Sequence, residues 1–147
     1  GKPMTRQWQL MRDAETFLEA SRLANNALMA IHFLQLARER GEMIDPVHIK
    51  KTDDGIKLLE AMLRTLEARE RKETVSSEAL SVLYVLSQGR MVGDPTSLKK
   101  IIKDSISELE NFKEGKVETL EEAEELLETI ASSTSEEASK ARRSAFS

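Results

Sequence analysis

The sequence has no cysteine and only two histidines, and aromatic residues make up 4% of its 147 residues. The absence of cysteine excludes disulfide scaffolds, thiol nucleophiles, thiolate metal sites and iron–sulfur clusters. Two histidines are too few for a three-histidine zinc site within one chain. Because aromatic side chains are scarce, a folded core must be built from aliphatic residues and methionine. We expect no cofactor.

Long apolar runs are also missing. No run exceeds the five residues of Ala27–Ile31, whereas a membrane-spanning helix needs about 18 apolar residues. Asp13, Glu15 and Glu19 stand where the apolar part of a signal peptide would lie. These features predict an intracellular, cytoplasmic protein that does not contact a membrane.

With three prolines and six glycines, the chain has few of the residues that a many-turned β protein uses. No proline or glycine interrupts residues 5–40, and Gly41 follows as a typical helix terminator. This pattern predicts one long helix, with a possible break at Asn25 and Asn26. Its segment 23–37 is apolar around nearly the whole circumference, which indicates a central buried helix or one covered by a second subunit.

The middle of the chain is harder to divide. We interpret residues 41–52 as a connector and predict a second helix from residue 53 or 54 to residue 71, with apolar residues on one stripe. Segment 76–87 is short and partly β-branched, so a strand and a buried helix compete there. A single strand would have nothing to pair with, and we therefore predict a buried helix.

Asp94 and Pro95 form a strong helix start, with Asp as the N-cap and Pro at the first helical position. The helix that they open should end at Gly115. Thr119 and Glu122 match a capping box and predict that the next helix begins there.

The C-terminal end contains the Ser-rich stretch 132–135, which we interpret as a linker that stops this helix. Thr134 and Glu137 match a second capping box, which would open a short, weak helix. The expected fold is an all-α bundle of about five helices with the long helix, about 5–40, at its centre. We expect residues 5–131 to form one domain, residues 132–147 a linker with a helical or frayed tail, and residues 1–4 a cloning remnant.

The net charge of −4 is unevenly distributed. Residues 1–116 hold 19 Lys or Arg against 18 Asp or Glu, and residues 117–137 hold eight Glu and no base. Residues 138–147 hold three bases and no acid. An electrostatic partner should therefore be sought at the C-terminal end.

A stripe on the long helix follows a 4-3-4-3-4 spacing. Such spacing is typical of a helix–helix seam, in which a buried polar residue fixes the register. The polarity of most members favours a solvent-facing strip instead. The possible self-association seam comprises Ser21, Asn25, Leu28, His32, Gln35 and Glu39.

Two further charged groups are candidate contact surfaces, although each is also what an ordinary solvated helix face looks like. The acidic segment could dock a basic partner, mimic a polyanion or shield a basic surface of this protein. The basic tail could fold back on this segment or bind to that of another subunit. The possible polyanion contact comprises Lys99, Lys100, Lys103, Arg142 and Arg143. The possible basic-partner contact comprises Glu121, Glu122, Glu125 and Glu128.

Signatures of catalysis and metal binding are weak. Asp45 and His48 could both ligate a metal, but a turn in which Asp45 caps the backbone is the simpler interpretation. Gly-x-Ser-x-Gly, Gly-x-Gly-x-x-Gly and Walker-type motifs do not occur. We expect no catalytic, cofactor-binding or metal-binding residues.

These observations favour a non-enzymatic helical module for protein–protein interaction or assembly that associates with itself. The alternative is a nucleic-acid-associated accessory or regulatory protein that uses the basic groups of the 95–115 helix and the tail. A small enzyme is the third possibility, and it would require a pocket in which several Glu side chains converge.

Overall fold

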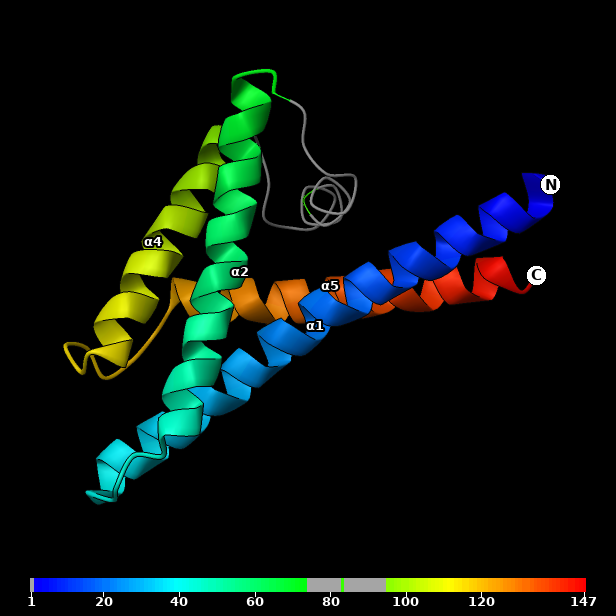
Figure 1. Ribbon diagram of the computed structural model, residues 1–147. Helices are drawn as coiled ribbons and strands as arrows, with labels where there is room; N and C mark the ends of the chain where they lie inside the picture. Colours follow the sequence, from blue (N-terminus) through cyan, green and yellow to red (C-terminus); the bar gives the residue numbers. More distant parts are fainter. Residues whose placement is uncertain (1, 74–82, 84–94) are drawn as a thin grey trace.

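The computed structural model describes residues 2–73, 83 and 95–147. Four α-helices occur in this part of the chain: α1 Lys2–Arg40, α2 Pro46–Glu70, α4 Pro95–Lys113 and α5 Glu122–Ala145. None of the described residues forms a strand, which confirms the all-α class for these segments (Figure 1). The helix predicted over 76–87 lies outside the described residues apart from Leu83, which is helical and buried.

The long helix α1 agrees with the prediction and continues through Asn25 and Asn26 without a break. Its end has the geometry that a glycine terminator requires. Gly41 has a φ of +67°, and its N–H donates to the carbonyl of Arg38. The N–H of Glu42 donates to the carbonyl of Ala37 at 2.8 Å, which completes a Schellman motif.

The predicted start of the second helix is wrong by about two turns, because α2 begins at Pro46 and includes most of the expected connector. Asp45 is the N-cap, and its Oδ1 accepts a hydrogen bond from the N–H of Val47 at 3.0 Å. The interpretation of Asp45 as a backbone cap is therefore confirmed. Proline fits the first helical position because the N–H that it lacks would have no partner there.

The start of α5 also differs from the prediction. Thr119 does not cap it, and the helix begins at Glu122. A side chain of α4 replaces the expected cap: Glu108 Oε1 accepts hydrogen bonds from the N–H groups of Glu121, at 2.8 Å, and Ala123, at 3.3 Å. These two bonds satisfy donors that a helix N-terminus leaves without an intrahelical partner.

The expected break at residues 132–135 is wrong, because α5 runs continuously to Ala145. Thr134 is fully buried in the helix, and its hydroxyl donates to the carbonyl of Ile130. Ala138, Ala141 and Ala145 continue the buried face at 3–4 residue spacing. Packing of this face against α1 outweighs the low helix propensity of the Ser and Thr residues.

The four helices form two antiparallel pairs that cross (Figure 1). The helix α1 packs against α2 and α5, and α4 packs against the same two helices. Ion pairs join α2 to α4 at both ends, Lys99 to Glu70 and Lys113 to Asp53, each at 3.1 Å. The expectation that α1 lies at the centre is therefore corrected. Two neighbours cover most of its apolar circumference, and α1 forms one side of the bundle.

Two regions follow from this crossing. We call the crossing of all four helices the body, and its fully buried side chains include Ile31, Leu59, Phe112 and Leu127. We call residues 6–16 of α1 and 135–145 of α5 the arm, which projects beyond α2 and α4 (Figure 1). The arm carries both ends of the chain. Its buried side chains are all alanine, namely Ala14, Ala138, Ala141 and Ala145.

Candidate interaction surfaces

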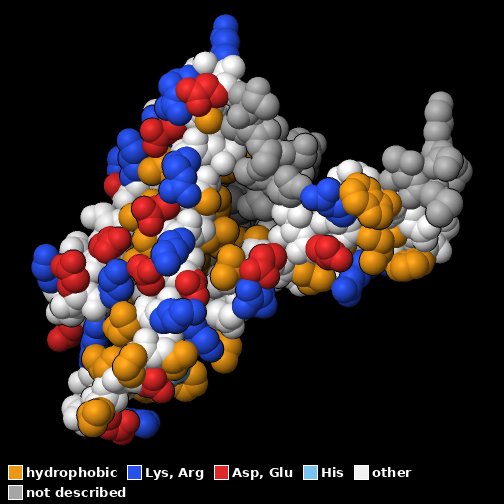
Figure 2. Space-filling view, viewed as in Figure 1, with side chains coloured by type: hydrophobic (Ala, Val, Ile, Leu, Met, Phe, Trp, Pro, Cys, Tyr) orange, Lys and Arg blue, Asp and Glu red, His pale blue; other side chains and the backbone are white. Residues whose placement is uncertain are grey.

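Five large apolar side chains are exposed along the end of α1 and in its turn into α2. Figure 2 shows hydrophobic side chains gathered at this lower end of the molecule. We call this surface the apolar corner. Its members, with the exposed fraction of each, are Met29 (58%), Phe33 (44%), Met43 (95%), Ile44 (36%) and Val47 (40%).

Local sequence signals hold two of these side chains outside. The Schellman motif at Gly41 ends α1 abruptly, and Asp45 with Pro46 opens α2 after only a short connection. Met43 and Ile44 occupy that connection and are exposed. The two caps therefore account for the position of Met43 and Ile44, whereas Met29 and Phe33 are exposed on a face of α1 that its neighbours leave uncovered.

A groove of about 240 Å³ lies beside Met43. The ring of Phe33 stacks on that of His48, with 4.9 Å between ring centres and 22° between ring planes. Nδ1 of His48 is buried and has no hydrogen-bond partner among the described residues. The groove is lined by Phe33, Leu34, Leu36, Ala37, Arg40, Glu42, Met43, Asp45 and His48.

The predicted seam on α1 is partly occupied within the chain. Ser21 is buried, and its hydroxyl donates to the carbonyl of Ala131 in α5 at 3.0 Å. Asn25 donates to the hydroxyl of Ser21, and Leu28 packs against the core. His32 is exposed. The first half of the stripe therefore faces α5 of the same molecule.

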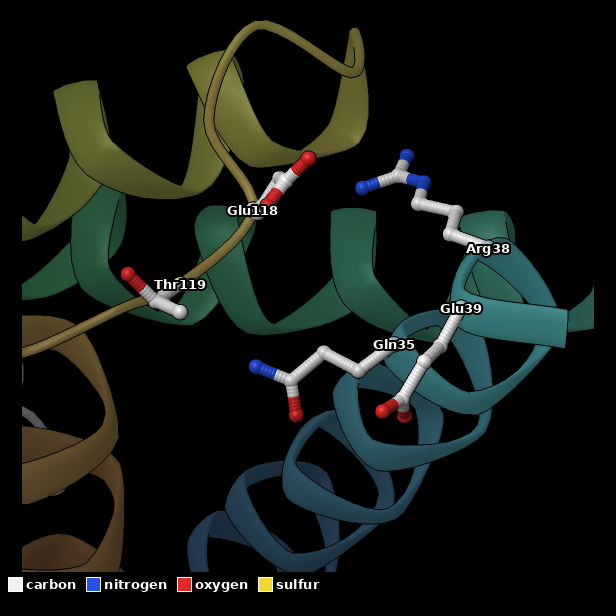
Figure 3. Close-up of a pocket in the computed structure, with 5 residues that line it drawn as sticks. All are labelled: Gln35, Arg38, Glu39, Glu118 and Thr119. Carbon is white, nitrogen blue, oxygen red and sulfur yellow. The ribbon is translucent and has the colours of Figure 1, made fainter.

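Gln35 and Glu39, the last members of the stripe, border a second groove of about 620 Å³ (Figure 3). Glu118 and Thr119 of the segment before α5 lie on its other side. Arg38 also lines it and is held by the body: its Nη2 donates to the carbonyl of Lys113 at 3.2 Å. The lining side chains stand apart, so they form no set of converging donors.

Metal ligands do not converge elsewhere in the described part of the chain. No group of three or more His, Asp or Glu side chains there is arranged to hold a metal ion. Asp45 is occupied as a cap, and His48 is stacked on Phe33. The expectation of a non-enzymatic protein stays a prediction.

The predicted acidic residues form one exposed face at the start of α5. We call Glu121, Glu122, Glu125 and Glu128 the acidic shoulder. No salt bridge joins any of them to a base among the described residues.

The half-buried Glu124 lies beside this shoulder. Burial raises its pKa, as do the negative charges of Glu128 and Glu108, while His32 has a weaker lowering effect. Acidic charge is therefore crowded at this end of α5. Lys100 of α4 lies near it: the hydrogen bond and charge of Asp104, and less strongly the charge of Glu122, raise the pKa of Lys100.

The predicted basic residues do not form one surface. Lys99 pairs with Glu70, and Lys100 pairs with Asp104 at 2.7 Å. Both belong to α4, whereas Arg142 and Arg143 lie near the C-terminus, at the opposite side of the molecule (Figure 1). Lys103 is exposed on α4. The separation weakens the case for a single polyanion-binding stripe, and nucleic-acid binding stays a prediction.

The sequence reasoning missed the end of the arm. Exposed aromatic and basic residues occur there both on α1 and at the end of α5. Figure 2 shows hydrophobic and basic side chains side by side on the arm. The guanidinium carbon of Arg12 lies 4.9 Å from the ring centre of Trp8. We call the exposed aromatic and basic residues around this end of the arm the arm tip. It comprises Arg6, Trp8, Arg12, Arg142, Arg143 and Phe146.

None of the described helices is long and apolar enough to cross a membrane. Comparison of the chain with protein-family models, curated proteins and solved structures gives no match. Function must therefore be argued from the surfaces themselves.

Proposed function

We propose that this protein is a non-enzymatic helical assembly module that associates with itself through the apolar corner. One observation carries the proposal: Met43, Ile44 and Val47 are exposed at the turn between α1 and α2, and Met29 and Phe33 are exposed on the part of α1 that leads to it. Clustered apolar exposure of this kind marks interaction sites on proteins, whereas singly scattered apolar residues do not. Methionine and aromatic residues are also enriched at the centres of interfaces.

The corner continues the apolar circumference of α1. Within one molecule α2 and α5 cover most of segment 23–37, but Met29 and Phe33 keep about half of their surface exposed. A second copy that covers these two side chains would complete the burial of the helix. The hydrophobic effect favours that contact in proportion to the apolar area removed from water.

The shape of the corner suits a two-fold contact between identical surfaces. Such a contact requires a surface that is complementary to itself, and a projection beside a recess on each copy provides this. Met43 is the projection, with 95% of its side chain exposed, and the 240 Å³ groove beside it is the recess. The flexible thioether chain of methionine adapts well to an irregular groove.

The charged rim is also self-complementary. Arg40 and Glu42 flank the groove, and both are exposed. Neither forms a salt bridge within the described part of the chain. A two-fold axis through the corner would bring Arg40 of each copy toward Glu42 of the other. Complementary rim charges select the partner and fix its orientation.

Substitution of Met43 tests the proposal. Met43→Glu should weaken dimerisation about tenfold or more, because it places a charge in the apolar centre of the contact. Met43→Leu is the matched control and should retain the dimer. Because Met43 is almost fully exposed, neither change should alter the helical circular dichroism. A Met43→Glu protein whose light-scattering mass equals that of the wild type at every concentration would contradict the proposal.

A charge exchange on the rim tests the orientation. Arg40→Glu alone should weaken the dimer because two acids then face each other across the axis. The double variant Arg40→Glu/Glu42→Arg should recover most of the loss, since each new base again faces an acid. If the double variant is weaker than Arg40→Glu alone, the two-fold arrangement is wrong.

A further inference from the structure

We propose that the arm tip is a second docking surface, and that its partner is the acidic shoulder of another copy of this chain. This contact is separate from the apolar corner and does not depend on it. The corner is mainly hydrophobic, whereas the tip and the shoulder are matched by charge. The two surfaces should therefore respond differently to salt.

The tip is an exposed surface of aromatic and basic groups. Trp8 and Phe146 expose 58% and 73% of their surface. Residues 1–12 and 138–147 together hold six Lys or Arg and no Asp or Glu. Arg142 and Arg143 are exposed and form no salt bridge with another described residue. Aromatic rings beside arginines are typical of interface hot spots.

Helix stability explains only half of this charge. The bases at the end of α5 face the negative end of its helix dipole, which is favourable. Arg6 lies near the start of α1, where no acid occurs in the first turn. A base at the positive end of a helix is unfavourable. The helix dipole therefore accounts for the bases at the end of α5 but not for Arg6.

The shoulder offers the opposite charge, but it is out of reach within one molecule. Arg142 follows Glu125 by 17 residues on the same uninterrupted helix. At 1.5 Å per residue, the two positions are about 26 Å apart. That distance exceeds the Debye length of about 8 Å at physiological ionic strength. Because α5 has no break, the tail cannot fold back onto the shoulder.

Two copies of the chain can bring these opposite charges together. If they lie side by side and antiparallel, the tip of each reaches the shoulder of the other. Both contacts then form at once about a two-fold axis, and the pair is closed. A nucleic acid or another polyanion fits less well, since the shoulder and the net charge of −4 would repel it.

Sedimentation in a Met43→Glu background isolates this contact from the corner. We expect dimers at about 0.1 M salt and monomers at about 1 M salt, where the Debye length falls from about 10 Å to about 3 Å. A mass that does not change with salt would overturn the proposal. The proposal would also be overturned if the mass did not change with salt but the protein shifted an oligonucleotide in a gel. That result would identify a polyanion as the partner of the arm tip.

Charge reversal supplies the stricter test. Arg142→Glu/Arg143→Glu and Glu125→Arg/Glu128→Arg, each alone in the same background, should weaken association about tenfold or more. A mixture of the two proteins should restore the dimer, because each tip then meets a shoulder of opposite sign. Failure of the mixture to associate, with both proteins folded by circular dichroism, would overturn the assignment.

Discussion

The body and the arm are built from the same two long helices but have very different interiors. In the body, α1 and α5 bury large side chains such as Ile31 and Leu127 against two further helices. In the arm the same helices meet through alanines. Each buried methylene contributes about 0.8 kcal/mol. The body therefore supplies most of the stability. The arm is a narrow two-helix extension of the body.

The body therefore holds the fold together, whereas the arm presents an exposed surface. Small buried residues let α1 and α5 run close together, which leaves aromatic and charged residues on the outside of the arm. Regions with few buried apolar contacts open at lower free energy than the core does. We expect the amides of the arm to exchange hydrogen faster than those of the body.

The largest expected effect comes from removing a large buried side chain from the body. Phe112 is fully buried, and the guanidinium of Arg38 lies 4.6 Å from its ring centre. Phe112→Ala removes the ring, leaves a cavity and should lower the free energy of unfolding by about 3–5 kcal/mol, measured by urea denaturation.

The matched change in the arm is Ala141→Gly. It should cost about 1 kcal/mol in helix propensity and should act mainly on local hydrogen exchange. Equal losses of global stability from Phe112→Ala and Ala141→Gly would refute the division into body and arm.

The next effect tests a close approach of α1 and α2 within the body. A Cβ added to Gly55 of α2 would lie 2.7 Å from the Cβ of Ala27 in α1. Gly55→Ala should therefore destabilise the protein by about 1–3 kcal/mol through overpacking, although alanine is the better helix former by about 1 kcal/mol.

Thermal unfolding measures the change, and Ala27→Gly in the same chain should recover part of the loss. Should Gly55→Ala raise the stability, the tight contact assigned to α1 and α2 would be wrong.

The smallest effect concerns the acidic end of α5. The protonated form of Glu124 is favoured in the folded protein because burial raises its pKa, with Glu128 and Glu108 adding to the effect and His32 opposing it. The stability that it contributes is present below the ordinary pKa of Glu and is lost as pH rises through the raised folded pKa. Glu124→Gln should therefore stabilise the protein above that window by about 0.2–0.5 kcal/mol, the cost typical of a like-charged pair one turn apart.

Urea denaturation across the acidic-to-neutral pH range checks whether Glu124→Gln raises the free energy of unfolding at the higher pH values. The gain should disappear at a pH below the ordinary pKa of Glu. Glu125→Gln is the control: Glu125 also has acids one turn away, but it is exposed, so a smaller gain there isolates the effect of burial on Glu124. A gain that grows as pH falls would contradict the account of Glu124.

The sequence predicted α1 well because its signal is local: residues 5–40 contain no helix breaker, and Gly41 follows. The start of α2 carried the same kind of signal, since Asp45 and Pro46 repeat the pattern of Asp94 and Pro95. That signal identifies Pro46 as the first residue of α2, whereas the apolar stripe alone begins only at Ile56.

The failures at α5 have a different origin, because they depend on contacts between helices. Glu108 of α4 replaces Thr119 as the cap, and packing against α1 keeps Thr134 helical. Neither effect can be seen in local sequence. The same limit applies to the apolar corner, since only the placement of α2 and α5 decides which part of an all-round apolar helix stays exposed.

The central claim is that the protein associates with itself through the apolar corner. The most direct measurement is the light-scattering mass of the wild-type protein at about 1 M salt, where contacts between charged groups are screened. At concentrations on the order of tens of micromolar, we expect a mass approaching twice the 16.6 kDa of one chain. A mass of one chain at every concentration would contradict the account.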